Sequence, residues 1–592
     1  MRAHRPLFLI AVAALGCQPA HAPVATAPAP APVSALAAPA KDPTDSLMAA
    51  MSVHDKVGQL IVPWLPGNYT ALDDSSFLVS ARWVDSLHVG GIIISYGSPF
   101  DIAAKLNVLQ LRSRLPLLIG ADLEYGAGMR LAGGTSFPAI MAAGATGRPE
   151  DAYTIGRAAA REGRAVGIHV DFAPDADLNN NPLNPIINTR SFGEDPAQVS
   201  RLVTAFVHGV QDNGMLATLK HFPGHGNTGI DSHIGLPYIG AGYRQLDSLE
   251  LVPFRAGIAA GVAVVMSAHI ALPAITGGDD PGTLSKAVLT GMLRDSLKFK
   301  GLVVTDALTM GAIVSKYGAG EATVRAFLAG SDLLLMPADP DSAMTSMTQA
   351  VVSGRITPAR LDSSLRAVLE TKYKLGLFAR RTVSLDSIMG IVGSKATQDQ
   401  ADDIAARALT LVRDTTGTLW SVRRRRSKIA LIAYGDELNS SVGQLLTTEL
   451  RAGGDTIEYF RLWPMSGPAS YDSARTVMAR ANTVVFTSVV RPLSGRGTIA
   501  LPDSLAHLIA VTDSVKPTLL ISVGSPYLLD QVPTAHSYLL GWSDARAVER
   551  ALGDALLGKT AIGGHLPIRV PPYAVGWGIT LAPGMPCDCM RR

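Results

Sequence analysis

The segment Lys220–His233 gathers side chains that can do acid–base chemistry. It holds one lysine, three histidines and one aspartate, with proline and glycine where a loop must bend. The apolar residues Leu216–Leu219 directly before it are typical of a buried strand. Polar side chains at the end of a buried strand cost free energy unless a site uses them. The segment therefore indicates an enzyme.

Asp231 and His233 stand two positions apart near the end of this segment. A carboxylate at that spacing can hold the imidazole ring and favour its charged form. A histidine held in this way can donate a proton to a leaving oxygen and later activate water. The alternative is a loop histidine that bonds only to the backbone. His225 is interpreted as a structural residue of the same loop.

Asp306 ends a second apolar segment, Gly301–Thr305. An acid at this position can be a nucleophile, a substrate ligand or the N-cap of a following helix. Other polar residues also follow apolar segments, and together they favour a catalytic role for Asp306. These residues are Asp122, Asp175, Asp177, Lys220 and His269.

Apolar segments alternate with helical stretches through the first two thirds of the chain, which predicts a (β/α)8 TIM-type barrel. Most of these segments lack polar residues, as expected for parallel strands that are covered on both faces. The polar residues named above fall at their carboxyl ends, where barrel enzymes build their sites. The predicted strands are Gly58–Val62, Val89–Ile94, Leu117–Ala121, Ile168–Phe172, Leu216–Leu219, Val262–Met266, Leu302–Thr305 and Asp332–Met336.

A second α/β series follows and predicts a smaller, open, doubly wound α/β sandwich domain. No glycine-rich dinucleotide fingerprint follows its first strand, so no cofactor is assigned. The predicted strands are Ile429–Ala433, Ile457–Leu462, Val484–Val490, Thr518–Val523 and Ser537–Leu540, with helices at Ser441–Ala452 and Ala545–Leu557. The barrel is predicted at 45–380, a connecting region at 381–426, the second domain at 427–575 and a tail at 576–592.

Cations near the predicted strand ends suit the recognition of a sugar. Arg130, Arg190 and Lys220, with the acid Asp122, could hydrogen-bond a polyhydroxylated ring, and a cation could also grip a carboxylate or N-acyl carbonyl. For each cation taken singly, a surface salt bridge is the alternative. Arg190 is the most suggestive, because Asn188–Pro196 has the composition of a tightly turned loop before a helix.

Taken together, Lys220–His233, the Asp306 segment and the Arg190 loop resemble glycoside hydrolase family 3, in particular its β-N-acetylglucosaminidase branch. The resemblance covers roughly residues 45 to 380, and looser motifs at Val523–Tyr527 and Gly563–Pro567 extend it into the second domain. It implies a retaining mechanism with Asp306 as nucleophile, His233 as general acid/base and Asp231 as its partner. It also implies that a sugar is held in the −1 subsite by Asp122, Arg130, Arg190, Lys220 and His221.

The histidine-containing loop implies N-acetylated substrates, since β-glucosidases of the family generally take their acid/base glutamate from the other domain. Chitin oligosaccharides and peptidoglycan fragments both fit, and phosphorolysis or a β-glucosidase activity is an alternative. Two positions depart from the family pattern. Asn227 replaces an acid or small residue, with little expected effect, and Tyr125 stands where a glycine is usual and could narrow the pocket.

The N-terminus has the plan of a signal peptide at residues 1–22. Arg2 and Arg5 precede the short apolar run Leu7–Leu15, and Cys17 stands where a bacterial lipoprotein is lipidated. Simple cleavage after Ala22 is the alternative. Residues 23–44 are rich in proline and alanine, which suits a tether. An exported, periplasmic or cell-surface protein is expected, with membrane contact only through the lipid.

Composition narrows the remaining function classes. The formal net charge of +3 on 592 residues gives no support for a nucleic-acid partner. Cys587 and Cys589 make a poor metal site by themselves. Two rival functions are a metal hydrolase that uses His221, His225, His233 and Asp231, and a non-catalytic sugar-binding lipoprotein. No metal is assigned, and the oligomeric state is left open.

Overall fold

The computed structural model describes residues 42–423, 427–436, 440–497 and 499–584. The predicted signal peptide with Cys17, nearly all of the tether, and Cys587 and Cys589 lie outside the described residues. Within the described ranges, no helix has both the length and the apolar character that a membrane crossing requires.

The predicted barrel is confirmed. Strands β2 to β8 form one parallel sheet in chain order, and β1 pairs in parallel with β9. The wall comprises β1 (Ile61–Val62), β2 (Trp64–Leu65), β3 (Gly91–Ile94), β4 (Leu118–Ala121), β5 (Val170–Asp171), β6 (Leu216–Phe222), β7 (Val264–Ser267), β8 (Leu302–Val304) and β9 (Leu334–Leu335).

Pro63 explains why the first barrel strand is divided into two. It lies between β1 and β2 and has no N–H to donate, but its carbonyl accepts from the Ile93 N–H at 2.9 Å. β1 therefore pairs with β9 while β2 pairs with β3. A bridge between Val304 and Leu333 joins β8 to the last strand, so the barrel closes.

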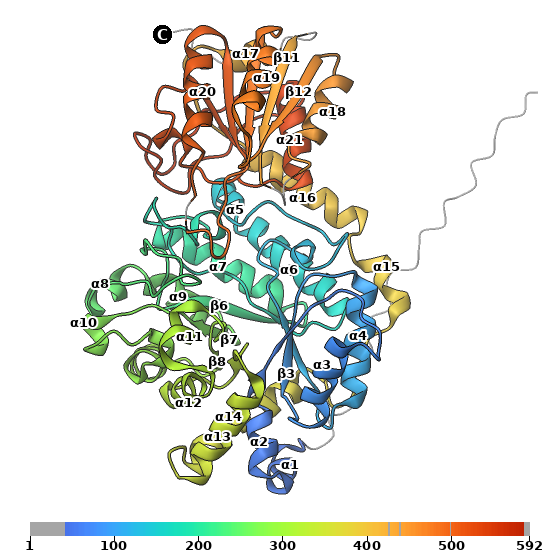
Figure 1. The fold of residues 1–592 in the computed structure, drawn as a ribbon, viewed down its shortest axis with the longest axis vertical. Coiled ribbons are helices and arrows are strands. Elements are labelled where there is room, and N and C mark those ends of the chain that lie inside the picture. Colours follow the sequence, from blue (N-terminus) through green and yellow to red (C-terminus); the bar gives the residue numbers. More distant parts are fainter. Residues whose placement is uncertain (1–41, 424–426, 437–439, 498, 585–592) are drawn as a thin grey trace, which may run out of the picture. The chain divides into compact units, whose positions relative to one another are not determined.

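Helices surround these strands in the blue-to-yellow half of Figure 1. Many begin with a side-chain cap and a proline, as α7 does with Asp195 and Pro196, and bury one apolar face. The longer ones are α3 (Ser75–Asp85), α4 (Pro99–Arg112), α6 (Pro149–Ala165), α7 (Pro196–Gln211), α9 (Leu251–Ala259), α12 (Ala319–Ala329), α13 (Pro340–Val352) and α14 (Pro358–Lys374). Short ones include α1 (Thr44–Ala50), α2 (Val53–Gly58), α5 (Met141–Thr146), α8 (Tyr243–Ser248) and α11 (Gly311–Tyr317).

Two predicted boundaries in the barrel are wrong. The predicted first strand starts at Gly58, but helix α2 continues to that residue, and the strand begins at Ile61. The predicted fifth strand ends at Leu219, whereas β6 continues to Phe222. Lys220 and His221 therefore lie inside a buried strand, where paired carboxylates make their charges tolerable.

The second domain contains an α/β sheet with the strand order β10-β15-β14-β13-β11-β12. Its strands are β10 (Thr410–Asp414), β11 (Lys428–Tyr434), β12 (Thr456–Leu462), β13 (Thr483–Ser488), β14 (Thr518–Ser522) and β15 (Ser537–Leu540). Its helices include α16 (Lys395–Ala408), α17 (Thr418–Arg423), α18 (Gln444–Ala452), α19 (Pro468–Ala479), α20 (Asp503–Val515) and α21 (Arg546–Leu556). Strand β10 lies within the predicted connecting region and pairs antiparallel with β15.

Barrel and second domain share a close contact. Met141, Ala142 and Ala145 of α5 are buried in the hydrophobic core of the second domain. The Asn179 amide donates to the Tyr527 hydroxyl at 2.8 Å, and the Asn188 amide donates to the Ser525 hydroxyl at 3.3 Å. The family-like motif Val523–Tyr527 is thus part of this contact.

Candidate active site

A cavity of about 850 Å³ opens at the carboxyl ends of the barrel strands. Its walls contain residues from both predicted sets, the acid–base groups and the sugar-binding groups. The predicted residues in the lining are Asp122, Arg130, Arg190, Lys220, His221, His233 and Asp306. Asp231 is buried behind His233 and is bonded to it.

Asp306 follows β8 and faces this cavity as an anion. One carboxylate oxygen accepts the Ala307 N–H at 2.7 Å. Burial alone would raise the pKa of Asp306, but the imidazoles of His269 and His221 and the Ala307 N–H hold it at about 2. His269 in turn bonds the Ala307 carbonyl at 3.0 Å, which fixes the backbone beside the carboxylate. The carboxylate is therefore ionised at neutral pH.

His233 and Asp231 form a hydrogen-bonded pair. The distance from His233 Nδ1 to Asp231 Oδ1 is 2.8 Å, and the same oxygen accepts the His233 backbone N–H at 2.9 Å. A carboxylate accepts hydrogen bonds, so Nδ1 carries the hydrogen and Nε2 is the nitrogen that can exchange a proton. The His233 side chain is 34% exposed while Asp231 is fully buried. The pair therefore presents a proton-exchanging group to the cavity from a fixed support.

The loop that carries His233 packs against the chain that follows Asp306. The Ala312 N–H donates to the Ser232 carbonyl at 3.4 Å, at the start of α11. Gly311 is required there, because a Cβ atom at this position would stand 2.9 Å from the His233 carbonyl oxygen. These contacts connect the two predicted catalytic residues through their backbones.

A network of charged side chains forms the floor of the cavity. Lys220 Nζ lies 2.7 Å from Glu124 and 3.1 Å from Asp122, and Arg190 contacts Glu124 through two nitrogens at 2.9 and 3.1 Å. Arg190 also lies 3.3 Å from Asp175. Burial would raise the pKa of Glu124, but Arg190 and Lys220 lower it well below its usual range. The buried carboxylates therefore hold the Lys220 and Arg190 side chains in fixed positions.

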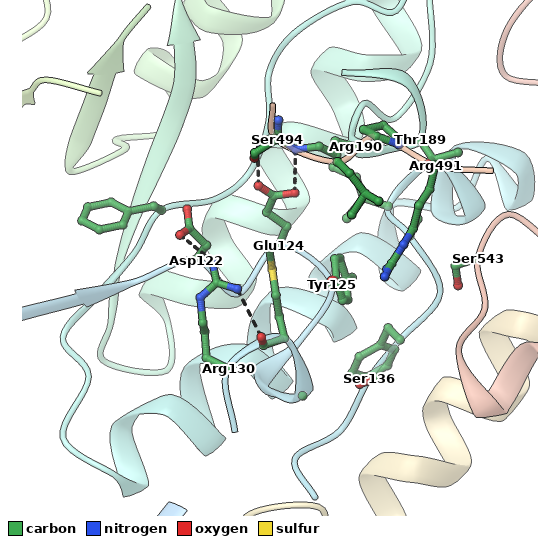
Figure 2. Close-up of a pocket in the computed structure, with 18 of the residues that line it drawn as sticks. Asp122, Glu124, Tyr125, Arg130, Ser136, Thr189, Arg190, Arg491, Ser494 and Ser543 are labelled. Carbon is green, nitrogen blue, oxygen red and sulfur yellow. Dashed lines mark hydrogen bonds and ion pairs between the residues drawn. The ribbon is translucent and has the colours of Figure 1, made fainter. Parts of the chain in front are cut away.

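Arg130 holds the opposite side of Asp122. Its guanidinium lies 2.8 Å from Asp122 Oδ2 (Figure 2). Lys220 binds the other carboxylate oxygen at 3.1 Å. Burial would raise the pKa of Asp122, but Lys220 and Arg130 lower it. An ionised Asp122 can accept hydrogen bonds from sugar hydroxyls.

Asp177 organises the histidine loop. It accepts the backbone N–H groups of His221 and His225, the latter at 2.6 Å, and lies 2.7 Å from His221 Nδ1. Burial works against a charged His221, but Asp177 raises its pKa. His225 bonds the hydroxyls of Thr228 and Ser232 at 2.8 and 3.1 Å, which agrees with a structural role.

These bonds also bear on the metal-hydrolase rival. The three imidazoles of the loop bond separate partners: His221 bonds Asp177, His225 bonds two hydroxyls, and His233 bonds Asp231. Among the described residues, the candidate metal clusters do not contain this four-residue set. One cluster joins His221 to Asp175 and Asp177, but Arg190 and Lys220 already lie 3.3 and 4.0 Å from Asp175, and Asp177 is bonded to His221.

Comparison with known proteins decides the family. The model of the glycosyl hydrolase family 3 N-terminal domain matches residues 52–371. A β-N-acetylglucosaminidase/β-glucosidase from Cellulomonas fimi is 31% identical over 543 residues, covering 88% of this chain and 94% of that protein. The chain belongs to glycoside hydrolase family 3. The resemblance predicted from the motifs is confirmed, and the protein is a glycosidase.

Other family 3 relatives resemble the chain to different extents. The β-hexosaminidase LpqI of Mycobacterium tuberculosis is 34% identical over 55% of this chain and 84% of its own length. A solved family 3 β-N-acetylglucosaminidase from Paenibacillus sp. str. FPU-7 has a TM-score of 0.79 and 32% identity, covering 88% of this chain and 99% of that chain. A solved β-glucoside phosphorylase has a TM-score of 0.81 and 26% identity, covering 89% and 96%.

The second domain of this family 3 enzyme lines the site. Arg491, Ser494 and Ser543 all line the cavity, and Figure 2 shows Arg491 extended toward Tyr125. Arg491 lies 3.7 Å from Asp544. The Gly495 N–H donates to Asp231 Oδ2 at 2.8 Å, so the second domain also bonds the partner of His233.

Sequence reasoning missed three contributors to the family 3 site. Glu124 stands two residues after Asp122, but nothing local shows that it pairs with both Lys220 and Arg190. Arg491 and Gly495 lie in a loop of the second domain, more than 250 residues after the histidine loop. A signal was present at Glu124, since a second acid two residues after Asp122 is another polar residue beyond the end of β4.

Proposed function

We propose that this family 3 enzyme is an exported, retaining β-N-acetylhexosaminidase. It removes terminal β-linked N-acetylglucosamine from chitin oligosaccharides or peptidoglycan fragments. One observation carries the proposal: an ionised Asp306 and a His233 that is held by the buried Asp231 line the same cavity. The relatives named β-hexosaminidase or β-N-acetylglucosaminidase support the substrate class.

The first step forms a glycosyl-enzyme. The Asp306 carboxylate attacks the anomeric carbon, the bond from that carbon to the leaving oxygen breaks, and His233 Nε2 gives its proton to that oxygen. Asp231 stabilises the imidazole ring while its charge changes. The imidazoles of His269 and His221 and the Ala307 N–H hold the pKa of Asp306 at about 2, so the nucleophile is ionised at neutral pH.

The second step releases the sugar. His233, now neutral, takes a proton from a water molecule, and the oxygen of that water attacks the anomeric carbon and displaces Asp306. The products are the free N-acetylhexosamine and the regenerated carboxylate. The protonated His233 is then ready for the next cycle. An imidazole can serve as both acid and base because its pKa lies near neutrality in water.

The floor network supplies the −1 subsite in this proposal. Asp122 and Lys220 face the cavity as an ionised acceptor and a donor, and their mutual bond fixes both. Arg130 and Arg190 add guanidinium donors that are themselves held by Asp122 and Glu124. Such preorganised donors lower the cost of orienting a polyhydroxylated ring.

Two variants test the catalytic assignment. Asp306→Ala should abolish hydrolysis of 4-nitrophenyl N-acetyl-β-glucosaminide, whereas His233→Ala should lose about 10²–10⁴-fold on a poor leaving group and less on an activated one. His536→Ala is a matched control outside the site, because His536 Nδ1 lies 2.8 Å from Asp513 Oδ2 and the His536 backbone N–H donates to the same oxygen, as in the His233–Asp231 pair. Full activity of Asp306→Ala would refute the assignment. Activity should also survive treatment with a strong chelator.

Phosphorolysis is a second candidate. The structural likeness to a β-glucoside phosphorylase and the Arg491 cation in the cavity wall favour it. An imidazole acid/base would also repel a phosphate acceptor less than a glutamate would. Incubation with inorganic phosphate separates the two, since phosphorolysis yields a sugar 1-phosphate and hydrolysis yields the free sugar.

Export and lipidation rest on the N-terminal sequence. Arg2, Arg5, the apolar run Leu7–Leu15 and Cys17 support processing at the membrane. Membrane fractionation of cells that express the wild type or Cys17→Ser provides the test. The wild type should sediment with membranes and Cys17→Ser should become soluble, and equal distribution of the two would contradict lipidation.

A further inference from the structure

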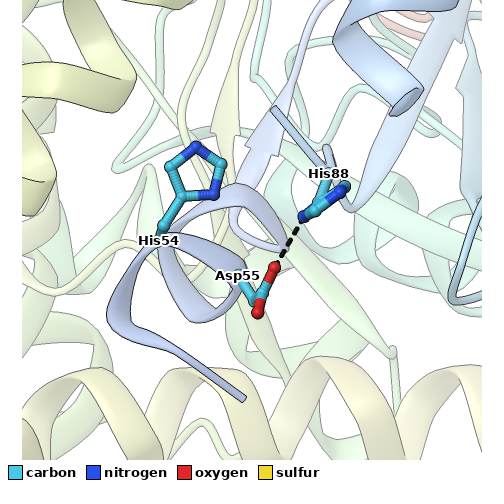
Figure 3. A group of neighbouring side chains, drawn as sticks. All are labelled: His54, Asp55 and His88. Carbon is cyan, nitrogen blue, oxygen red and sulfur yellow. Dashed lines mark hydrogen bonds and ion pairs between the residues drawn. The ribbon is translucent and has the colours of Figure 1, made fainter. Parts of the chain in front are cut away.

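A cluster of metal-binding side chains lies near the amino ends of the first barrel strands. His54 and Asp55 are in the first turn of α2, which precedes β1, and His88 is in the turn that precedes β3 (Figure 3). The catalytic residues follow the carboxyl ends of the strands, so this cluster is separate from the active site. None of its members lines the catalytic cavity.

The coordinating atoms of this His54–Asp55–His88 cluster are already close together. One ligand atom from each residue lies within 4.8 Å of both others. His88 Nδ1 is 2.6 Å from Asp55 Oδ1, and the two imidazole rings meet edge to face with centroids 5.7 Å apart. A tetrahedral Zn²⁺ with bonds of 2.0–2.1 Å places its ligands roughly 3.3 Å apart. Small side-chain rotations reach that spacing.

The backbone around the cluster is held in place. Asp55 Oδ2 bonds the Ser52 backbone N–H and hydroxyl, so that its other oxygen points at His88. His88 has a left-handed backbone (φ 51°), and its carbonyl accepts from the Gln59 amide at 2.8 Å. The Asp55 and His88 side chains are only 18% and 19% exposed. Ligands fixed by outer hydrogen bonds in this way bind metals more tightly.

The charges nearby leave room for a cation. Lys56, beside Asp55 in the sequence, is paired with Asp362 at 2.7 Å. Arg114 lies 3.4 Å from Asp55 Oδ1, but its side chain is 69% exposed and can turn into solvent when a metal neutralises the carboxylate. A metal ion would replace the hydrogen that His88 and Asp55 now share.

We infer that His54, Asp55 and His88 bind a divalent transition-metal ion such as Zn²⁺. Two imidazoles and a carboxylate, with water in the fourth position, are a donor set that suits Zn²⁺, whereas Ca²⁺ and Mg²⁺ require oxygen ligands. The bound ion links α2 to the turn before β3 and so stabilises the base of the barrel. It takes no part in hydrolysis.

The full chain, stripped with a chelator and dialysed, tests this site. Titration with ZnCl₂ followed by calorimetry and thermal unfolding should show one bound equivalent and a raised Tm. Calcium and magnesium chlorides should raise neither. His54→Ala and His88→Asn should weaken zinc binding tenfold or more, and asparagine is chosen because it tolerates the left-handed backbone of residue 88.

His536→Ala is the control, since His536 and Asp513 form a histidine–aspartate pair without a second imidazole. It should bind zinc as the wild type does, and hydrolysis by all three variants should be unchanged. Zinc binding that persists unaltered in both His54→Ala and His88→Asn would overturn the inference. So would a wild type whose Tm does not respond to zinc.

Discussion

Replacement of Glu124 by glutamine should both destabilise the barrel and disorganise its site. Glu124 is 2% exposed and accepts three charge-assisted bonds, one from Lys220 and two from Arg190. Glutamine keeps the shape but removes the negative charge. Its amide nitrogen would also face a donor, because both partners are cations that cannot accept a hydrogen bond.

The loss of stability in Glu124→Gln follows from the two cations that remain buried. Lys220 is 2% exposed in its side chain and would lose its nearest carboxylate, while Arg190 would keep Asp175 as its remaining carboxylate, at 3.3 Å, and the Ile186 carbonyl. Breaking a buried pair by removing one partner costs about 3–5 kcal/mol. A displacement of either cation by about 1 Å should also lower kcat/KM by roughly 10²-fold.

Glu162→Gln is the matched control. Glu162 is equally buried, but its carboxylate accepts the Thr135 N–H and hydroxyl, and burial raises its pKa. Glu162→Gln should therefore lower the free energy of unfolding by less than Glu124→Gln does, by about 1–2 kcal/mol. Urea unfolding at pH 7 compares both variants with the wild type, together with kcat/KM on the chromogenic N-acetylglucosaminide. Equal stability losses in the two variants would refute the reasoning.

The effect of pH on this comparison has a definite sign. The folded pKa of Glu124 is lowered, so its stabilising contribution is complete above its ordinary value of 4.5. The contribution declines as the pH falls from there toward the folded pKa. The stability difference between wild type and Glu124→Gln should therefore be constant from pH 6 to 8 and shrink below about pH 4.5.

Two further predictions concern other parts of the chain. Arg491→Ala should raise KM more than it lowers kcat for oligosaccharides, with little change in Tm, because Arg491 lines the cavity from the second domain; an unchanged KM would exclude a substrate contact. Lys372→Met should raise the free energy of unfolding at pH 7, because burial lowers the pKa of Lys372 to about 7 and its neutralisation opposes folding between pH 7 and 10 by more than the lost hydrogen bond to Gln59 at 2.7 Å favours it. The variant should lose the rise in stability that the wild type shows over that range, and exposed Lys374 is the control for the same substitution.

The barrel strands could be predicted because they are buried on both faces. Strands β4, β7 and β8 start and end within two residues of the predicted positions, since an unbroken apolar run marks each of them. The apolar pattern does not predict strand ends where tertiary contacts override it. Lys220 and His221 look like loop residues, yet they continue β6 because carboxylates from neighbouring strands balance their charges.

The edge strand β10 and the contacts between distant segments could not be predicted from the sequence either. Strand β10 is a short antiparallel edge, and its pattern does not distinguish it from a connection. Glu124 stands just beyond the end of a predicted strand, but its role depends on Arg190 and Lys220, which lie 66 and 96 residues away. His54 and His88 form no metal-binding spacing motif in the sequence. The turn before β3 brings them together only in the folded barrel. Long-range packing supplies this information, and a single sequence does not display it.

The bond from the Gly495 N–H to Asp231 joins residues 264 positions apart, and it ties the His233–Asp231 pair of the barrel to the second domain. Separation of the second domain would remove the hydrogen bond to Asp231 Oδ2 and the part of the cavity wall that Arg491, Ser494 and Ser543 supply, while Asp306 and His233 stay on the barrel. Loss of hydrolysis should then precede melting of the barrel, so enzyme activity itself can serve as a reporter of domain docking. A barrel produced without the second domain would need another hydrogen-bond donor in place of the Gly495 N–H.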